Sequence, residues 1–344
     1  MGSLIHSRIT LNDVAAAAGV SVSTASRALS GQAERYRIRE STAKQIQAEA
    51  ARLGFRPSRV ARSLRLQRTG LIGVIVPDVS NPFFSAIARE VTLAAEDAGY
   101  SVLLADSQEE TGREQKLLGE LIAREVEAVV ACPVGMDESH LLDAMHGGLP
   151  LVLVDRAFPN SSFLQVTSAH EMGAAKAVGL LTSRGHRDIG ILQGLPGTFP
   201  NEARLRGSRK AIESVGMNWL PERVSGDNFT EESGYQSTRL LLKKHPAVTA
   251  LFAMSMPNAL GALRAAKEVG RSVPQDLSLV AFDDSPFADL MEVPITTVVQ
   301  DICQLGRKAA QLAMERLTGR RASRKKFHEI KVTVRQRDSI LKLR

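Results

Sequence analysis

Cysteines and long apolar segments are scarce in this sequence. Its 344 residues include only two cysteines, Cys132 and Cys303. Their separation suits neither a metal site nor a redox pair, so we expect both to lie buried in a reducing compartment. No apolar run approaches the roughly 20 residues of a bilayer-spanning helix, and the N-terminus lacks the apolar core of a signal peptide. These absences argue against export and membrane insertion and predict a cytoplasmic protein.

The common catalytic motifs are missing as well. The sequence contains no phosphate-binding P-loop, no HExxH and no GxSxG, and its 7 histidines show no metal-ligand spacing. The triplet His186-Arg187-Asp188 begins like a kinase catalytic loop, but Gln193 stands where that loop needs asparagine. We therefore predict no catalytic residue, no cofactor and no metal site, which favours a binding protein over an enzyme.

Positive charge is concentrated in the first fifth of the chain. Residues 1–70 hold 12 of the 44 lysines and arginines but only 4 of the 37 acidic residues. This segment therefore carries a net charge of +8, whereas the whole chain carries +7. A basic segment can be an ordinary solvated surface, but on a compact helical module it indicates a polyanionic partner.

Two short helices with a glycine-containing turn are predicted in this basic segment. Thr10 and Asp13 form the Thr-x-x-Asp pattern of a capping box, which predicts a helix over 11–18. Gly19 can end that helix, and the next one is predicted over 22–29. This arrangement is typical of a helix-turn-helix, whose second helix enters the major groove of DNA.

The second predicted helix has no acidic residue, and a third is predicted over 40–53. The positions around the second helix that we expect to face outward are small, uncharged or basic: Ser21, Val22, Ser23, Thr24, Ser26 and Arg27. Arg27 can make bidentate bonds to guanine, and the hydroxyls suit phosphate oxygens. We interpret the segment as DNA-binding; the alternative is a helical hairpin without a DNA partner.

From residue 71 onward, apolar strands alternate with helical patterns. The predicted strands are 71–78, 100–107, 127–134, 150–155, 187–194, 249–255, 277–284 and 296–301. Continuous apolar strands separated by helices are typical of parallel sheets covered on both faces, and this number is enough for two doubly wound sheets. Ligands in such sheets bind beyond the carboxyl ends of the strands. The polar residues at those ends are Asp78, Asp106, Asp155, Ser255 and Asp283.

Several segments together resemble the LacI/GalR family of bacterial transcription regulators. They are ITLNDVAAAAGVSVSTASRALSG, FRPSRVARSLR, TGLIGVIVPDVSNPFF, VDRAF, RGHRDIGILQG, ARLRG, VPQDLSLVAFDD and TTVVQD. The resemblance extends over nearly the whole chain. It implies a homodimeric regulator, most often a repressor in that family, that binds pseudopalindromic double-stranded operator DNA. Its core would resemble a periplasmic sugar-binding protein of two subdomains and would bind a small effector.

The resemblance also predicts the domain organisation. A helix-turn-helix head precedes a hinge helix with linker and an effector-binding and dimerisation core: 9–56, 57–70 and 71–344. The core would divide into an N-subdomain over about 71–168 and 299–327 and a C-subdomain over about 169–298 and 328–344. In that family a hinge leucine wedges into the minor groove, and by position this is Leu64, with Ala61 and Arg65 beside it. Such apolar wedges unstack a base step and bend the duplex.

The resemblance assigns effector-binding roles along the core. Asn81 and Phe83 lie in the family's first ligand loop, and Arg204 in ARLRG matches its ligand-binding arginine. The strand-end residues expected to meet the effector are Asp106, Asp155, Ser255 and Asp283. Arg156 has two interpretations. It is either a second guanidinium for a sugar phosphate, or it pairs with a neighbouring acid and the effector is a neutral sugar.

Two departures from the common family pattern place the sequence nearest the fructose and sucrose repressor branch. The segment GQAERYRIRE is about three residues longer than the usual version, and its Tyr-Arg-Ile at 36–38 resembles that branch. Ser255-Met256 stands where many relatives have Asn-Asp. The alternatives are a sugar-uptake binding protein, which has no use for residues 1–65, and a sugar-processing enzyme, for which no nucleophile is recognisable.

Overall fold

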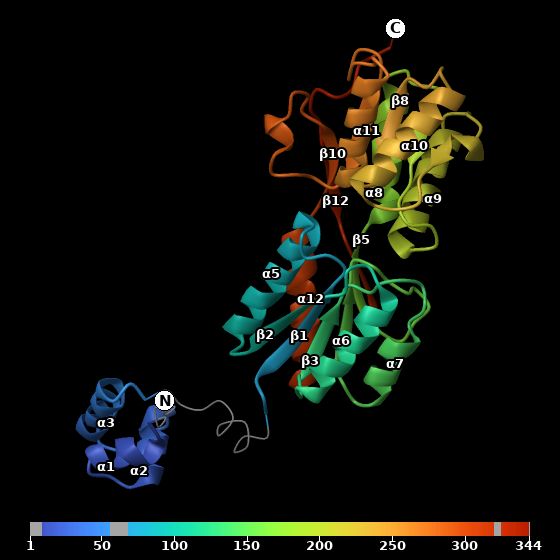
Figure 1. The fold of residues 1–344 in the computed structure, drawn as a ribbon. Coiled ribbons are helices and arrows are strands. Elements are labelled where there is room, and N and C mark those ends of the chain that lie inside the picture. The colour runs from blue at the N-terminus through green and yellow to red at the C-terminus, as the bar shows by residue number, and fades with distance from the viewer. Residues whose placement is uncertain (1–8, 56–67, 320–324, 344) are drawn as a thin grey trace, which may run out of the picture. The chain divides into compact units, whose positions relative to one another are not determined.

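The chain forms two compact units, residues 1–69 and 70–344. A computed structural model describes residues 9–55, 68–319 and 325–343. We call the described part of the first unit the head and the second unit the core (Figure 1).

The head consists of three helices, α1 (Leu11–Ala17), α2 (Val22–Leu29) and α3 (Glu40–Arg52). The predicted capping box is present, because the Asp13 carboxylate accepts the Thr10 backbone N–H at 2.8 Å and the Thr10 hydroxyl accepts that of Asp13 at 3.4 Å. Gly19 adopts the left-handed conformation at φ +65° that turns the chain after α1. The three predicted helices are confirmed to within one residue at each end.

Small side chains let the three head helices approach closely. Val14 on α1, Ala25 on α2 and Ile46 on α3 are completely buried against one another. Ala18 and Ala50 complete the contact without adding bulk. The head therefore has its own apolar core, which fixes the outward face of α2.

The core contains two six-stranded sheets. The first has the order β11-β5-β4-β3-β1-β2, and all its paired strands are parallel. In that order the strands are Phe327–Ile330, Leu164–Ser168, Leu151–Val154, Ala128–Ala131, Leu71–Val76 and Ser101–Asp106. One face packs against α5 (Pro82–Asp97) and α12 (Ile302–Leu317), and the other against α6 (Thr111–Ala123) and α7 (Ser139–His146).

The second sheet has the order β12-β10-β9-β8-β6-β7, with only β12 antiparallel to its neighbour. In that order the strands are Val332–Arg335, Thr296–Gln300, Ser278–Phe282, Ala250–Ala253, Ile189–Leu192 and Val224–Ser225. Its faces are covered by α8 (His170–Ser183) with α9 (Phe199–Glu213), and by α10 (Glu231–Lys244) with α11 (Met256–Glu268). Two short 3₁₀ turns, Pro221–Arg223 and Ala288–Leu290, lie in its loops.

The chain passes between the two sheets three times (Figure 1). The first crossing lies between β5 and α8 at Ala169, and the second between β10 and α12 at Asp301. The third lies between β11 and β12 at Lys331, beyond the predicted position near 327, because β11 still pairs with β5 of the first sheet. We call the two parts the N-subdomain and the C-subdomain.

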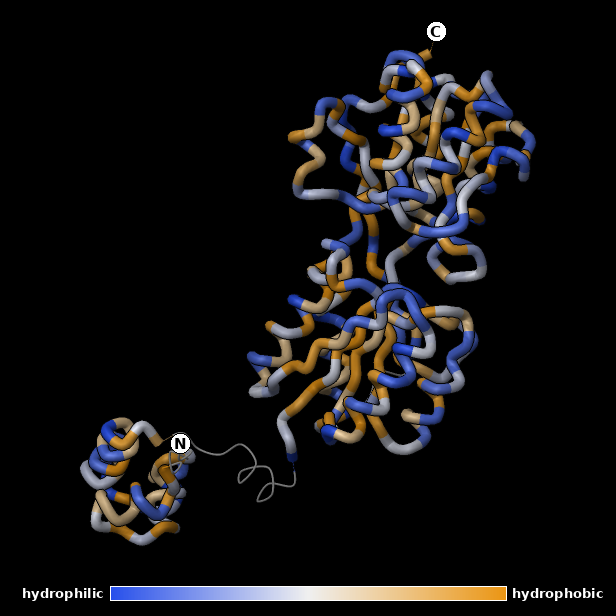
Figure 2. The backbone as a smooth tube through the Cα atoms, viewed as in Figure 1, coloured by the Kyte–Doolittle hydropathy of each residue, from blue (hydrophilic) through white to orange (hydrophobic). Residues whose placement is uncertain are grey.

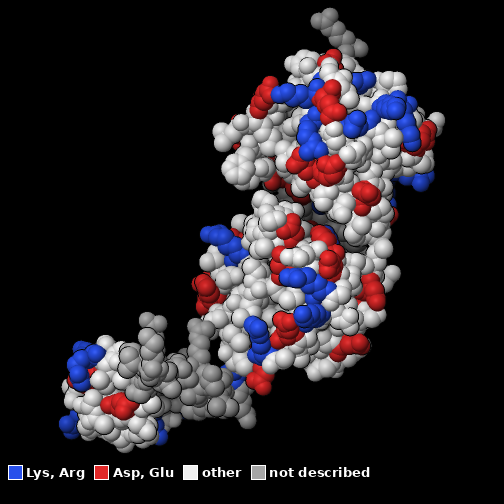
Figure 3. Space-filling view, in the orientation of Figure 1, with Lys and Arg blue, Asp and Glu red and all other residues white. Residues whose placement is uncertain are grey.

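The strands form the apolar centre of each subdomain, as the hydropathy colouring shows in Figure 2. On the face shown in Figure 3, acidic and basic side chains are scattered among uncharged ones, and acidic groups are visible on both halves of the core where these face each other. None of the described helices has the length and hydrophobicity needed to cross a membrane.

Several details differ from the sequence-based expectations. Four strands were not predicted: β5, β7, β11 and β12. Cys132 is buried as expected, but Cys303 is exposed, because it lies on the outward face of α12 while Leu305 points into the core. The expectation of two buried cysteines is therefore wrong for Cys303.

Candidate functional sites

The six head residues proposed to meet DNA lie on the outward side of α2 and at its N-cap. Ser21, Val22, Ser23 and Arg27 are exposed, and Thr24 and Ser26 are half-buried. Ala25 and Ala28, on the opposite face of α2, are buried in the head core. The Ser21 hydroxyl caps α2 by accepting the Thr24 backbone N–H at 3.2 Å, so this residue orders the helix that presents the others.

Arg27 lies against an aromatic ring from the longer segment between α2 and α3. Its guanidinium carbon is 4.1 Å from the centre of the Tyr36 ring, and that of Arg35 is 5.8 Å away on the same ring. A guanidinium over a ring face is held by the ring quadrupole. Tyr36 therefore restricts the orientation of the arginine that we expect to read a base.

The proposed hinge residues Ala61, Leu64 and Arg65 lie outside the described residues. Their roles remain predictions from the sequence.

A cleft of about 220 Å³ lies between the two subdomains, at the carboxyl ends of the strands. Seven of the eight predicted effector residues line it, and Asp106 does not. The lining residues are Asp78, Asn81, Phe83, Phe84, Glu109, Asp155, Arg156, Pro200, Arg204, Asn228, Phe229, Thr230, Ser255, Pro257 and Asp283.

Two aspartates reach the cleft because the chain turns sharply at two strand ends. Asp155 follows β4 and Asp283 follows β9, and both have left-handed backbone, at φ +65° and +72°. Aspartate tolerates this conformation better than most residues. The Asp155 carboxylate comes from the N-subdomain and the Asp283 carboxylate from the C-subdomain, so one acid stands on each side of the cleft.

Arg204 lies between these carboxylates, on α9. Its guanidinium is buried, lies 4.0 Å from the Asp283 carboxylate and stacks 3.7 Å above the Phe282 ring. One terminal nitrogen donates to the Met254 carbonyl and the other contacts His170 Nδ1 at 3.3 Å. Its Nε is buried without a hydrogen-bond partner among the described residues, so it is available to a ligand oxygen.

Burial shifts the protonation of the groups around Arg204. It raises the pKa of Asp155 to about 6, against the lowering effect of Arg204 and Arg156. It also raises the pKa of Asp283, again opposed by Arg204. Burial and then Arg204 hold the pKa of His170 well below its usual value, so this imidazole is neutral. Because an arginine can only donate, His170 Nδ1 accepts and the proton lies on Nε2, 3.8 Å from Asp155 Oδ1.

Asp106 takes a different position from the one predicted. β2 is the edge strand of its sheet, and the Asp106 carboxylate turns back to accept the Gln108 backbone N–H at 3.2 Å. The loop that it stabilises presents Glu109 to the cleft instead. Asp106 therefore supports the cleft wall and does not line it.

Arg156 is already paired inside the cleft. Its two terminal nitrogens donate to the two Glu109 carboxylate oxygens at 2.7 and 2.6 Å. Burial opposes the charge on Arg156, but the hydrogen bonds with Glu109 and the attraction of the nearby negative charges together outweigh it and raise its pKa. Of the two interpretations of Arg156, this geometry fits the pairing with a neighbouring acid.

Asn81 and Ser255 each cap a helix that begins at the cleft. The Asn81 side chain accepts the Phe83 backbone N–H at 3.0 Å at the start of α5. The Ser255 hydroxyl accepts that of Asn258 at 3.2 Å at the start of α11. The predicted residues thus mark two helix N-termini that point to the cleft.

Asp78, one of the polar strand-end residues expected near a ligand, also lines the cleft. Sequence reasoning missed the other seven lining residues: Phe84, Glu109, Pro200, Asn228, Phe229, Thr230 and Pro257. Asn228, Phe229 and Thr230 belong to the loop before α10, where the strand β7 that leads to it is only two residues long. Because β7 is too short to be recognised in the sequence, the loop that follows it was not predicted.

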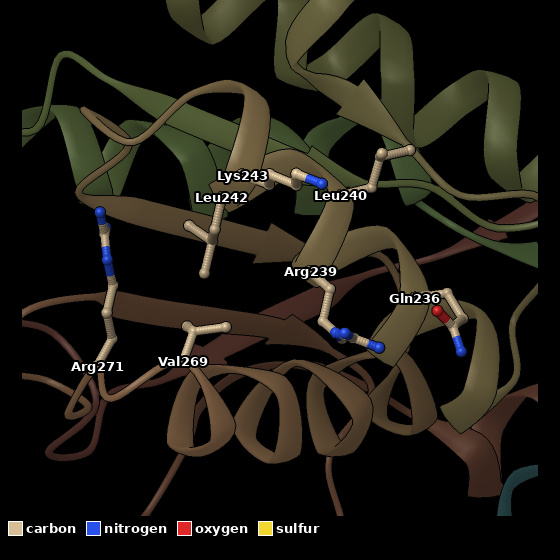
Figure 4. A pocket seen from close by; sticks show the side chains of 7 residues that line it. All are labelled: Gln236, Arg239, Leu240, Leu242, Lys243, Val269 and Arg271. Carbon is tan, nitrogen blue, oxygen red and sulfur yellow. The ribbon is translucent and has the colours of Figure 1, made fainter.

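A second hollow of about 560 Å³ lies away from the cleft, where α10 and the end of α11 meet (Figure 4). Leu240 and Val269 lie beside three cations there. Arg271 is held by the Val248 and Pro246 carbonyls, and Arg239 lies 3.6 Å from the Glu268 carboxylate. None of these residues belongs to the predicted effector site.

The head and the cleft together define a class of protein. A helix-turn-helix with a hydroxyl- and arginine-bearing second helix precedes a two-subdomain core with a polar ligand cleft. This combination is that of a DNA-binding regulator that responds to a small molecule.

Comparisons with known proteins specify the family. Residues 10–58 match the bacterial regulatory proteins of the lacI family, and residues 178–340 match the periplasmic binding protein-like domain. The ribose operon repressor of Halalkalibacterium halodurans is 34% identical over 308 residues, which cover 90% of this chain and 90% of the relative. The chain belongs to the LacI family of bacterial transcription regulators.

Solved structures confirm the predicted fold. A lac repressor dimer bound to operator and the anti-inducer ONPF has a TM-score of 0.86 at 26% identity, covering 97% of this chain and 99% of that one. A complex of the transcriptional regulator CelR with cellobiose has a TM-score of 0.74 at 29% identity, covering 96% and 100%. Both likenesses extend over the head and the core.

Proposed function

We propose that this protein is a cytoplasmic repressor that binds operator DNA as a homodimer and is controlled by a small sugar or sugar phosphate bound in the cleft. The names of its relatives support the repressor role, the sugar effector and the dimer on DNA. One is a ribose operon repressor, one was solved with cellobiose, and one was solved as a dimer on its operator. Assignment to the fructose and sucrose repressor branch stays a prediction that rests on residues 36–38 and on Ser255-Met256.

The observation that carries the effector site is the set of unpartnered polar atoms in the cleft. Asp155 Oδ1 and Arg204 Nε are buried without hydrogen-bond partners among the described residues. A polyhydroxylated ligand supplies donors for a carboxylate and acceptors for a guanidinium at the same time. Phe83 and Phe229 offer apolar faces to the ring carbons of such a ligand.

The link from cleft to DNA runs through the chain between head and core. β1 begins at Leu71, six residues after Arg65 of the proposed hinge. The hinge helix that we expect over residues 58–65 would be too short to stay folded without DNA or the hinge of the other subunit, because isolated helices need about 12–15 residues. Closing the subdomains on an effector would change the spacing of the two hinges in a dimer, and a small change would melt them and remove the Leu64 wedges.

A homodimer reads two half-sites, so we expect an imperfect palindrome of roughly 14–20 base pairs with a flexible pyrimidine–purine step at its centre. Selection of bound sequences from random DNA would recover inverted repeats of this kind. Recovery of single asymmetric sites would contradict the dimeric reading.

A thermal-shift screen with sugars and sugar phosphates tests the effector site. A ligand at 100 times its dissociation constant stabilises the fold by about 2.7 kcal/mol. The ligand found must then change operator affinity in a mobility-shift titration. Chemical turnover of that ligand by the purified protein would instead favour the sugar-processing alternative.

A further inference from the structure

The loop between β2 and α6 holds one carboxylate in a fixed position in the cleft. Gln108 and Glu109 both have left-handed backbone, at φ +55° and +58°, which residues other than glycine rarely adopt. Two hydrogen bonds keep the loop in place: Gln108 N–H donates to Asp106 Oδ1 at 3.2 Å, and Glu109 N–H donates to the Pro77 carbonyl at 2.9 Å. A strained conformation held by several partners is typical of a functional position.

The Glu109 carboxylate occupies the hydrogen-bonding fork of Arg156. Both terminal nitrogens of that arginine point at Glu109, and one of them also contacts the Pro133 carbonyl at 3.4 Å. The guanidinium is buried and lies 5.7 Å from the centre of the Phe84 ring. A phosphate that approached Arg156 would have to break two charge-assisted hydrogen bonds and displace a carboxylate that its loop holds in place.

The charge of the cleft also opposes an anion. Its charged lining residues are four acids and two arginines: Asp78, Glu109, Asp155, Asp283, Arg156 and Arg204. Arg156 is neutralised by Glu109, which leaves Arg204 to balance the other carboxylates. A phosphate carries close to two negative charges at neutral pH and would enter a site that is already negative.

We propose that Glu109 makes this cleft selective for uncharged sugars and against phosphorylated ones, because it occupies the Arg156 fork and adds negative charge beside it. The proposal rests on the proposed function, that the cleft binds a sugar-type effector, and it names the chemical class of that effector. By the same reasoning, removing the Glu109 charge leaves the positive charge of the buried Arg156 guanidinium uncompensated, which favours a phosphate.

The test compares matched ligand pairs on the full-length protein. Isothermal titration would use ribose with ribose 5-phosphate, fructose with fructose 1-phosphate, and glucose with glucose 6-phosphate. Of whichever pair it binds, the wild-type protein should bind the neutral sugar at least tenfold more tightly than the sugar phosphate. Glu109→Gln should reduce that ratio at least tenfold or reverse it.

Two further variants separate the specific pair from a general charge effect. Glu110→Gln makes the same charge change in the same loop, but Glu110 does not line the cleft, so the ratio should stay at the wild-type value. Glu109→Asp keeps the charge and should keep discrimination above that of Glu109→Gln.

Inorganic phosphate gives a readout that needs no sugar. Glu109→Gln leaves the buried charge of Arg156 without a negatively charged partner, so phosphate should raise the melting temperature of that variant at concentrations that leave wild type and Glu110→Gln unchanged.

The possible outcomes distinguish an error in the role of Glu109 from an error in the sugar-type effector. A wild-type protein that binds a sugar phosphate as tightly as its parent sugar overturns the role of Glu109 and leaves the sugar-type effector standing. The same conclusion follows if Glu109→Gln folds and keeps the wild-type ratio. If no member of any pair binds to wild type or to any variant, the sugar-type effector is wrong, and the role of Glu109 falls with it.

Discussion

Replacing Asp155 by asparagine should make the core more stable at neutral pH and less sensitive to pH. Asp155 is only 4% exposed, and its Oδ1 has no hydrogen-bond partner among the described residues. Burial raises its pKa from 3.8 to about 6, although Arg204 and Arg156 oppose the shift. The folded protein therefore holds a charge at pH 7.5 that the site disfavours.

The sign and size of the effect follow from linkage. Between pH 4 and 6 the folded carboxyl keeps a proton that the unfolded chain has lost, so the stabilisation is present at low pH and disappears as pH rises through 6. The rise in the pKa of Asp155 from 3.8 to about 6 corresponds to about 3 kcal/mol of folding free energy over the whole pH range, of which about 1.4 kcal/mol is lost between pH 5 and 7.5. That is a large part of a typical folding free energy of about 5–15 kcal/mol.

Urea unfolding at pH 5 and pH 7.5 measures this difference, and the single tryptophan, Trp219, reports on the C-subdomain. Asp283 acts in the same direction as Asp155, whereas the lowered pKa of His170 acts in the opposite direction. The informative quantity is therefore the change in pH slope between wild type and Asp155→Asn. Asp97→Asn, at an exposed aspartate, controls for the loss of one charge. An unchanged slope, or a variant less stable than wild type at pH 7.5, would refute an unfavourably buried carboxylate.

Three other substitutions test the proposed roles. Arg204→Met should keep operator affinity within about twofold but lose the effector response, a coupling of about 1–3 kcal/mol in typical allosteric proteins; mobility shifts with and without ligand would detect a retained response. Tyr36→Ala should weaken operator binding about two- to fivefold, because an exposed cation–π contact contributes about 0.5–1 kcal/mol, whereas Tyr36→Phe keeps the ring and the affinity; fluorescence anisotropy on operator and random DNA decides whether the loss is specific. Leu64→Ala should lose operator affinity and still bind effector by calorimetry, and loss of effector binding there would separate Leu64 from the hinge role.

Elements whose cause is local were predictable from the sequence. The capping box of Thr10 and Asp13 and the left-handed Gly19 define the head within a few residues, and apolar runs mark the central strands. β5 escaped because its sequence, Leu-Gln-Val-Thr-Ser, alternates like a half-exposed strand although all five residues are buried. Two of its polar side chains are satisfied by partners outside the strand: Gln165 bonds the backbone of Phe158, and Thr167 donates to the Asp155 carbonyl.

The residues of the cleft likewise divide into those that a general rule could find in the sequence and those that it could not. Asp155 and Asp283 were found because the ends of parallel strands meet at one edge of a sheet, which is a rule about topology. The pair of Glu109 and Arg156 joins residues 47 positions apart, and it depends on two consecutive left-handed residues that no local pattern announces. Asp106 was misplaced for the related reason that an edge strand ends in a loop, and the loop selects which of its acids faces the cleft.

Residues at the crossings between subdomains contact residues that line the cleft, such as Asp283 and Arg204, and this gives a physical route from ligand to subdomain arrangement. Ser168 and His170 flank the first crossing, and Gln300 immediately precedes the second. Each has a buried polar atom without a hydrogen-bond partner among the described residues, and Gln300 donates to the Asp283 carboxylate. An unsatisfied buried polar group costs about 1–3 kcal/mol. A ligand that binds Asp283 and satisfies even one such group therefore acts on a crossing directly, with an energy in the range of about 1–3 kcal/mol that allosteric coupling requires.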